Sequence, residues 1–252
     1  MSLLALEDVG LRFGGLQALS GVGFSVAAGE VVAVIGPNGA GKTSLFNAIT
    51  GYAGPVSGRI ALNGARIDGL PPHVIAERGI RRTFQNGGLF GALTVMENVL
   101  AGMHADIGGS VLATILRLPG IDRRERAASR TALALLEQMQ IAHMANRLAR
   151  ELSGGQQRIV EIVRAIATTP PLLLLDEPAV GLSPVARADL VAIIRRRAAE
   201  GTGVLLIEHA IELVMSVADR IVVLNGGRTI ADGPPAEIRA DRGVMEAYLG
   251  HG

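Results

Sequence analysis

The sequence contains no cysteine and no tryptophan, and aromatic residues make up only 3% of its 252 residues. The absence of cysteine excludes disulfides, thiolate metal sites and thiol catalysis. The formal net charge is +1, so the chain lacks the charge excess of a nucleic-acid-binding protein. No run approaches the roughly 18 apolar residues of a membrane span, and Glu7 and Asp8 stand where a signal peptide would be apolar. We therefore expect a globular protein of the cytosol.

Lysine is also nearly absent. Lys42 is the only lysine, and the other 23 of the 24 basic residues are arginines. Biased codon usage explains the shortage of lysine, but it does not explain the position of the one that remains. A site that needs a compact ammonium group, and not a planar guanidinium, would explain that position.

Short apolar runs alternate with helical patterns and predict an α/β fold. Residues 3–13 and 22–27 are typical of antiparallel strands. Residues 31–35 form a continuous β-branched run, the pattern of a strand buried on both faces. Three later runs share this pattern: 172–175, 204–207 and 221–224. With helical segments between them, such as residues 184–199, these runs predict a mostly parallel sheet covered by helices.

The middle of the chain shows helical periodicity and no strand pattern. Thr94 with Glu97, and Ser153 with Gln156, have the spacing of capping boxes, in which a hydroxyl and a residue three positions later satisfy the first helix amides. The predicted helices cover residues 95–104, 111–118, 123–139 and 154–167. We interpret this region as a helical subdomain inserted into the sheet domain.

These patterns predict a single domain over residues 1–252. Its sheet core comprises residues 1–85 and 169–252, and it begins with an antiparallel β subdomain. The helical subdomain comprises residues 86–168.

Residues 36–43, GPNGAGKT, match the phosphate-binding pattern G-x-x-x-x-G-K-[ST] at every fixed position. They follow the predicted strand 31–35 and precede a helical stretch, which is the context that the pattern requires. The glycines let backbone N–H groups point at phosphates, Lys42 reaches the β- and γ-phosphates, and the Thr43 hydroxyl suits Mg²⁺. A glycine-rich turn with a chance Lys-Thr pair would not account for both flanking elements. The predicted nucleotide-binding residues here are Gly36, Asn38, Gly39, Gly41, Lys42, Thr43 and Ser44.

Two adjacent carboxylates, Asp176 and Glu177, follow the predicted strand 172–175. A parallel strand delivers its last residues to the carboxyl edge of the sheet, beside the phosphate-binding loop. Asp176 suits Mg²⁺ through water, and Glu177 can orient or deprotonate the attacking water. Such a pair can also cap a turn or a helix, but the phosphate-binding loop favours the functional interpretation.

Residues 152–156, LSGGQ, precede this acidic pair and resemble the signature peptide of ABC ATPases. Other motifs of that family lie before and after this peptide, in the order in which the family has them, over about residues 3–225. Gln85 resembles the glutamine of the Q-loop, and His209 resembles the switch histidine. Phe13 resembles the aromatic residue that stacks on adenine, with a plain core residue as its alternative. The chain is therefore similar to ABC ATPases over most of its length.

The resemblance implies an ATPase that binds ATP with Mg²⁺ and works as a head-to-tail dimer. The signature residues of one subunit would then contact the γ-phosphate held by the other, with a helix N-terminus as the anion binder. These residues are Ser153, Gly154, Gly155 and Gln156. Ser153 can serve as a helix N-cap at the same time.

The resemblance also implies catalytic roles for Glu177, His209 and Gln85. It assigns the metal to Thr43, Gln85 and Asp176. Outside this family context, Gln85 would be an ordinary polar residue at a strand end and His209 a structural histidine.

One position departs from the family pattern. Many ABC proteins have an aspartate that touches the partner subunit where this chain has Ser183. Ser183 is also a good N-cap, and Pro184 is a good first helical residue. The cross-dimer role of this loop therefore stays open.

Residues 82–86, 94–99 and 204–225 resemble the ATP-binding subunits of branched-chain amino-acid importers. This implies a second ATP-binding subunit, identical or similar, and integral membrane permease subunits fed by a solute-binding protein. It places the chain at the cytoplasmic face of the inner membrane, bound through the permease. Nucleic acid is not an expected partner.

Several alternatives stay open at this point. A cytosolic ABC ATPase outside transport would share every nucleotide residue, although no coiled-coil insertion, second ATPase unit or basic patch is visible. A GTPase or kinase would share only the phosphate-binding loop. The cargo and the direction of transport are not determined by these motifs. Apolar residues that follow Gln85 either form a groove for a permease helix or cover their own core: Leu89, Phe90, Leu93 and Met96.

Overall fold

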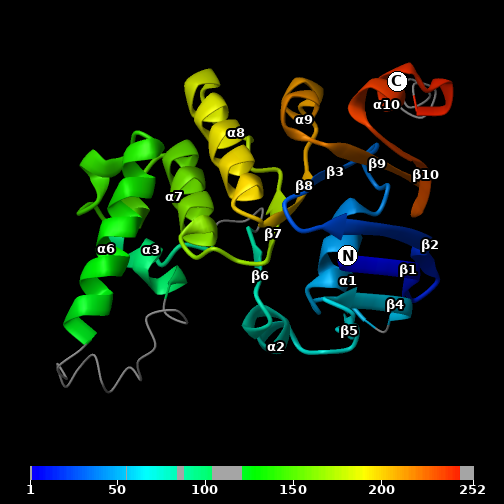
Figure 1. The fold of residues 1–252 in the computed structure, drawn as a ribbon, viewed down its shortest axis with the longest axis horizontal. Coiled ribbons are helices and arrows are strands. Elements are labelled where there is room, and N and C mark those ends of the chain that lie inside the picture. Colours follow the sequence, from blue (N-terminus) through cyan, green and yellow to red (C-terminus); the bar gives the residue numbers. More distant parts are fainter. Residues whose placement is uncertain (1, 55, 84–87, 104–120, 245–252) are drawn as a thin grey trace. The chain divides into compact units, whose positions relative to one another are not determined.

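The computed structural model describes residues 2–54, 56–83, 88–103 and 121–244 (Figure 1). Two units are distinguished by their contacts. The first comprises Met1–Arg82, Pro170–Glu177 and Ile193–Gly252, and the second comprises Thr83–Thr169 and Pro178–Ala192. The second unit thus draws on two segments of the chain, whereas the sequence predicts one insertion at 86–168, whose boundaries stay a prediction.

An antiparallel sheet forms the N-terminal part of the first unit. Its strands are β1 (Ser2–Phe13), β2 (Leu16–Ala27), β4 (Val56–Leu62) and β5 (Ala65–Arg66), in the order β2-β1-β4-β5. β1 and β2 form a hairpin in which Phe13 pairs with Leu16 across the two glycines of the turn. The predicted antiparallel pair is confirmed, although β2 starts earlier than predicted because its pairing continues to the turn.

The second sheet of this unit is mostly parallel, as the sequence predicts. Its strands are β3 (Val31–Ile35), β6 (Ile80–Arg82), β7 (Leu172–Asp176), β8 (Gly203–Ile207), β9 (Arg220–Asn225) and β10 (Arg228–Gly233). Their order is β10-β9-β3-β8-β7-β6, and only β10 runs antiparallel to its neighbour. Every residue of β3, β7 and β8 is buried. Because β3, β8, β7 and β6 are parallel, the residues that follow them meet at one edge of the sheet.

Helix α1 (Lys42–Ile49) shares one apolar core with strands of both sheets. Its Leu45, Phe46 and Ile49 are fully buried there, each contributing about 1.5–3 kcal/mol by the usual value of apolar burial. A smaller cluster joins β3 and β9 to helices α9 (Ile211–Val217) and α10 (Pro235–Ala240). A short helix α2 (Pro72–Glu77) also belongs to this unit. Packing into this core fixes the position of the start of α1, the helix that follows β3.

The second unit is helical in the residues that the structure describes. It contains α3 (Val95–Gly102), α6 (Ile121–Gln138), α7 (Gly154–Ile166), two 3-10 turns (Ala142–Met144 and Ala149–Glu151) and the start of α8 (Pro184–Ala199). Both predicted capping boxes are present, at Thr94 with Glu97 and at Ser153 with Gln156. The predicted helix over 111–118 lies outside the described residues. No helix of the described residues has the length and apolar character to cross a membrane.

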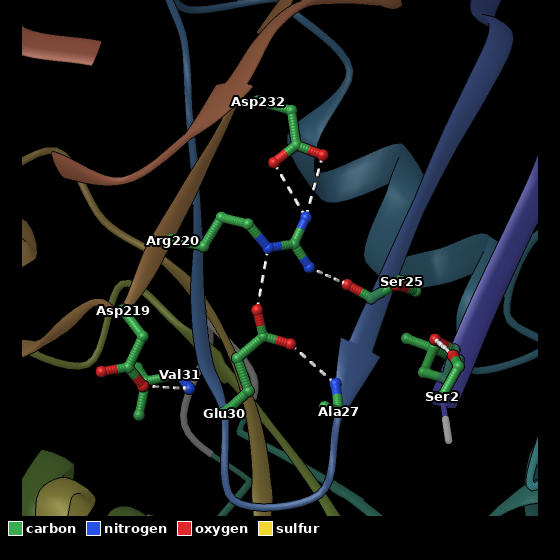
Figure 2. Close-up of polar contacts among 9 residues, drawn as sticks. Ser2, Ser25, Ala27, Glu30, Val31, Asp219, Arg220 and Asp232 are labelled. Carbon is green, nitrogen blue, oxygen red and sulfur yellow. Dashed lines mark hydrogen bonds and ion pairs between the residues drawn. The ribbon is translucent and has the colours of Figure 1, made fainter. Parts of the chain in front are cut away.

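A network of ion pairs fixes the turn that leads into β3 (Figure 2). Arg220 donates to Glu30 at 2.8 Å, to Asp232 at 2.8 Å and to the carbonyl oxygen of Ser25. Glu30 in turn accepts the backbone N–H of Ala27 at 2.7 Å. The network joins β2, β9 and β10 at the end of β3 that lies opposite the phosphate-binding loop.

Candidate functional site

The loop between β3 and α1 has a backbone that favours glycine at three positions. Gly36 has φ +152° and Gly41 has φ +101°, where a side chain is strained. A Cβ atom at Gly36 would lie 2.1 Å from the carbonyl oxygen of Leu224, and one at Gly41 would lie 2.6 Å from that of Ala18. Gly39 also has a positive φ, +80°, which strains a side chain, but no atom lies within 4 Å of the place of a Cβ atom there. The glycines therefore let the loop wrap tightly while leaving room on its outer side.

Helix α1 begins directly after this loop with its first amides uncapped by any side chain. Its N-cap is Gly41, and its first turn carries no acidic residue. Free N–H groups and the positive end of the helix dipole make this a favourable place for phosphate. Asn38 and Thr43 are exposed beside it, and Ser44 is half-buried.

Lys42 is buried and folds back over the loop. Its Nζ donates to the carbonyl oxygens of Gly36 at 2.7 Å and Pro37 at 2.9 Å. Burial lowers the pKa of Lys42, and the charges of Glu177 and Asp176 oppose that shift. The only lysine of the chain thus lies within electrostatic reach of both predicted carboxylates.

Asp176 ends β7 and is almost completely buried, with 1% of its side chain exposed. Arg82, at the end of β6, donates to its Oδ2 at 3.0 Å. The same guanidinium donates to Asn47 at 2.7 Å and to Thr50 at 3.0 Å, and it lies 5.4 Å from the centre of the Phe46 ring. Burial lowers the pKa of Arg82, while the hydrogen bond to Asp176 and its charge oppose this. Arg82 therefore joins β7 to α1, a role that no motif of the sequence predicts.

Glu177 and His209 lie side by side. Nε2 of His209, after β8, is 3.2 Å from Oε1 of Glu177, after β7. Glu177 has φ +47°, a left-handed conformation that is unfavourable for a side chain and is found more often at functional sites. Its N–H donates to the carbonyl oxygen of Ile207 at 2.9 Å, which holds this turn against β8. The structure therefore brings together two of the three residues predicted to be catalytic, and the third, Gln85, lies outside the described residues.

Phe13 stands at the tip of the β1–β2 hairpin with 48% of its surface exposed. The alternative that Phe13 is a core residue is therefore wrong. An exposed ring has a free face on which a flat heterocycle can stack.

The signature residues begin α7 in the second unit. Ser153 is the N-cap, with its Oγ accepting the N–H of Gln156 at 3.4 Å, and Oε1 of Gln156 accepting the N–H of Ser153 at 2.9 Å. Ser153 and Gly154 are exposed, and the first turn of α7 has no acidic residue. A Cβ at Gly155 would lie 2.7 Å from the carbonyl oxygen of Gly181, so this position requires glycine. This helix start is open to an anion on its outer side.

Ser183 caps α8, as the sequence predicts. Its Oγ accepts the N–H of Ala186 at 3.2 Å, three residues into the helix. The cap accounts for a serine at this position without any contact to a partner subunit.

The oxygen groups near Lys42 suit a magnesium ion that is shared with phosphates. No cluster of three or more His, Cys, Asp or Glu side chains that could hold a metal occurs in the described residues. Mg²⁺ is usually bound by one or two carboxylates together with substrate phosphates and water, and does not need such a cluster. A hydroxyl at Thr43 and a carboxylate at Asp176 fit that chemistry.

The fold and this site define a P-loop nucleotide-binding protein. The model of the ABC transporter family matches residues 19–180, and a model described as branched-chain amino acid ATP-binding cassette transporter matches residues 228–252. The chain belongs to the ABC transporter family, and within it is an ATP-binding subunit and an ATPase.

Its relatives include proteins of known transport systems. The chain is 46% identical to the high-affinity branched-chain amino acid transport ATP-binding protein BraF of Pseudomonas aeruginosa, with 98% of both chains covered. It is 41% identical to LivG of Escherichia coli, which has the same description, again with 98% of both covered. It is also 36% identical to the lipopolysaccharide export system ATP-binding protein LptB of Haemophilus influenzae, over 99% of this chain and 98% of LptB.

Solved structures agree with this placement. A nucleotide-free ATP-binding cassette of an ABC transporter matches with a TM-score of 0.82 and 34% identity, over 98% of this chain and 99% of the other. A bacterial ABC transporter cassette described as dimeric matches with a TM-score of 0.79 and 26% identity, over 92% of this chain and 98% of the other. The predicted family, fold and ATPase activity are confirmed.

Proposed function

We propose that the chain hydrolyses Mg-ATP to drive an importer of branched-chain amino acids or similar small polar solutes. The observation that carries the catalytic part is the contact between Glu177 and His209, at the sheet edge where Lys42 and Asp176 also lie. Glu177 acts as the general base that takes a proton from water. His209 contacts the carboxylate of Glu177 through Nε2 in the structure, and its N–H donates to the γ-phosphate once ATP is bound.

The phosphates bind to the loop between β3 and α1. Its N–H groups and Lys42 face the phosphates, while Phe13 stacks on the adenine. Thr43, Asp176 and Gln85 would hold Mg²⁺, which would supply positive charge to the phosphate oxygens. Arg82 holds the carboxylate of Asp176 in place through the hydrogen bond to its Oδ2.

A second ATP-binding subunit completes the site. Ser153, Gly154, Gly155 and Gln156 of that subunit contact the γ-phosphate through the uncovered start of α7. The solved cassette described as dimeric supports this arrangement. The second subunit is either another copy of the chain or a similar one.

Permease subunits dock on the loop before α3. Phe90 is 56% exposed there. The loop is held by Asn98, which is fully buried and accepts the N–H of Phe90 at 2.8 Å while donating to the carbonyl oxygens of Phe90 at 3.1 Å, Leu93 at 3.3 Å and Thr94 at 2.9 Å. An exposed aromatic on a rigid loop is typical of an interface anchor. Docking places the chain at the cytoplasmic face of the inner membrane, and a solute-binding protein feeds the permease.

Similarity to BraF and LivG over nearly the whole chain favours an amino-acid cargo. Similarity to LptB, at lower identity, supports export of a lipid-like cargo as the second candidate. Transport assays on the assembled system distinguish the two.

The catalytic assignment is tested by Glu177→Gln. Because the amide cannot take a proton, hydrolysis slows by roughly 10²- to 10⁴-fold while ATP stays bound. Single-turnover hydrolysis and equilibrium ATP binding measure the two effects. Glu200→Gln, an exposed glutamate paired with Arg196 on α8, is the matched control and hydrolyses at the parent rate. Parent-like turnover in Glu177→Gln would remove the proposed base.

A further inference from the structure

Glu208 is a buried carboxylate between β8 and α9, next to His209. Only 3% of its surface is exposed. Its Oε2 accepts the backbone N–H of His209 at 3.0 Å and that of Ala210 at 3.3 Å. A buried carboxylate is costly unless it is hydrogen-bonded, and these bonds to backbone N–H groups offset that cost.

The two N–H groups belong to the two peptide planes that flank the Cα atom of His209. Each peptide unit is planar, so fixing both planes fixes the φ and ψ angles of His209. Only the side-chain torsions of His209 then stay free, and the contact of its Nε2 with Glu177 at 3.2 Å limits these. The carboxylate of Glu208 therefore determines where the imidazole stands relative to Glu177.

We infer that Glu208 is a positioning residue for His209, and through it for the hydrolysis of ATP. This inference rests on the proposed role of His209. Glu208 itself is buried at the turn and acts through backbone contacts. A small misplacement of a catalytic group slows the reaction far more than it weakens substrate binding. A shift of about 1 Å can slow a reaction by roughly 10²-fold.

Three substitutions separate positioning from simple stability. Glu208→Ala removes the acceptor, and we expect hydrolysis about tenfold slower with the KM for ATP within about twofold of the parent. Glu208→Gln keeps an acceptor oxygen in the same place and restores the rate to within about threefold. Glu208→Asp keeps the charge but is one methylene shorter, so it cannot hold both N–H groups and behaves like the alanine variant.

The decisive measurement combines these changes with His209→Ala in the full chain. If Glu208 acts through His209, Glu208→Ala adds no further slowing once His209 is gone. The control is Glu30→Ala, since Glu30 also accepts a backbone N–H, that of Ala27, away from the site (Figure 2). Glu30→Ala lowers the melting temperature and leaves kcat unchanged in both backgrounds.

The outcomes are distinct. Slowing by Glu208→Ala or Glu208→Asp that vanishes in the His209→Ala background supports the inference, and if the alanine variant does not fold, the aspartate variant decides. Independent slowing in both backgrounds, or parent-like rates in all Glu208 variants while His209→Ala is slow, overturns the inference alone. Parent-like hydrolysis in His209→Ala overturns the proposed role of His209, and with it the inference.

Discussion

Arg82 joins residues that lie far apart along the chain. It contacts Asn47 in α1, Thr50 at the C-cap of that helix, and Asp176 at the end of β7, 94 positions away. Both members of the Arg82–Asp176 ion pair are buried, with 6% and 1% of their side chains exposed. Taking two charges out of water is costly, and the bonds that Arg82 donates to Asn47 and Thr50 offset part of that cost.

We expect Arg82→Met to lower the free energy of unfolding by about 3–5 kcal/mol, because it leaves the Asp176 carboxylate buried without its cation. Urea unfolding of the full chain measures this loss. Arg196→Met, which breaks an exposed pair with Glu200, is the matched control and costs about 0–1 kcal/mol. Equal losses in the two variants would mean that the buried ion pair contributes no more to the free energy of unfolding than the exposed one.

The candidate site was predictable where one motif carries the chemistry. Parallel pairing brings the ends of the buried strands β3, β7 and β8 to one edge of the sheet. Asp176 is the last residue of β7, and the other site residues come after these strands: Lys42, Glu177 and His209. Arg82 was not predictable, because its contacts depend on tertiary pairing that no local pattern reports.

At the scale of secondary structure, the continuous apolar runs gave the correct strands. β3, β7 and β8 are buried on both faces, and this burial requires the continuous apolar sequence from which the strands were predicted. β6 was missed because it has only three residues, two of them arginines, and it forms by pairing Ile80 with Leu172. β10 was missed because an edge strand can carry polar residues on its exposed side.

Helix starts were predicted best by capping chemistry. Oγ1 of Thr94 accepts the N–H of Glu97 at 3.2 Å, and Oε2 of Glu97 accepts the N–H of Thr94 at 2.7 Å. The pKa of Glu97 is lowered first by the bond from the backbone N–H of Thr94 and then by the bond that Oγ1 of Thr94 donates to Oε2 at 2.8 Å. Since the pKa is lower in the folded chain, this stabilisation is present above the ordinary pKa of glutamate and is lost as the pH falls through the lowered value.

We expect Thr94→Ala to lower the free energy of unfolding by about 1 kcal/mol at neutral pH, because it removes the N-cap hydroxyl of α3. This difference between the variant and the parent becomes smaller below the ordinary pKa of glutamate, because protonation of Glu97 weakens the capping box of the parent. Urea unfolding at neutral and acidic pH measures it. Thr131→Ala, an exposed threonine on α6, is the control and shows no such loss. A cost independent of pH would exclude the coupling to Glu97.

At the scale of the whole molecule, the two units carry different parts of the proposed ATPase site and of the proposed permease contact. The first unit carries Lys42, Asp176, Glu177 and His209, and the second carries the signature residues and the exposed Phe90. A site built from one subunit's phosphate-binding loop and another's signature helix needs both units in each copy. The permease contact, in contrast, needs only the second unit.

Replacing Leu89 and Phe90 together by alanine therefore separates docking from nucleotide chemistry. We expect co-purification with tagged permease subunits to weaken by at least about tenfold, because an exposed aromatic anchor carries a large share of interface energy. ATP binding stays within about twofold of the parent, since the phosphate-binding loop lies in the other unit. Ile230→Ala, an exposed apolar residue of β10 in the first unit, is the control and keeps full co-purification. If the Leu89 and Phe90 variant still co-purifies as the parent does, the docking surface lies elsewhere.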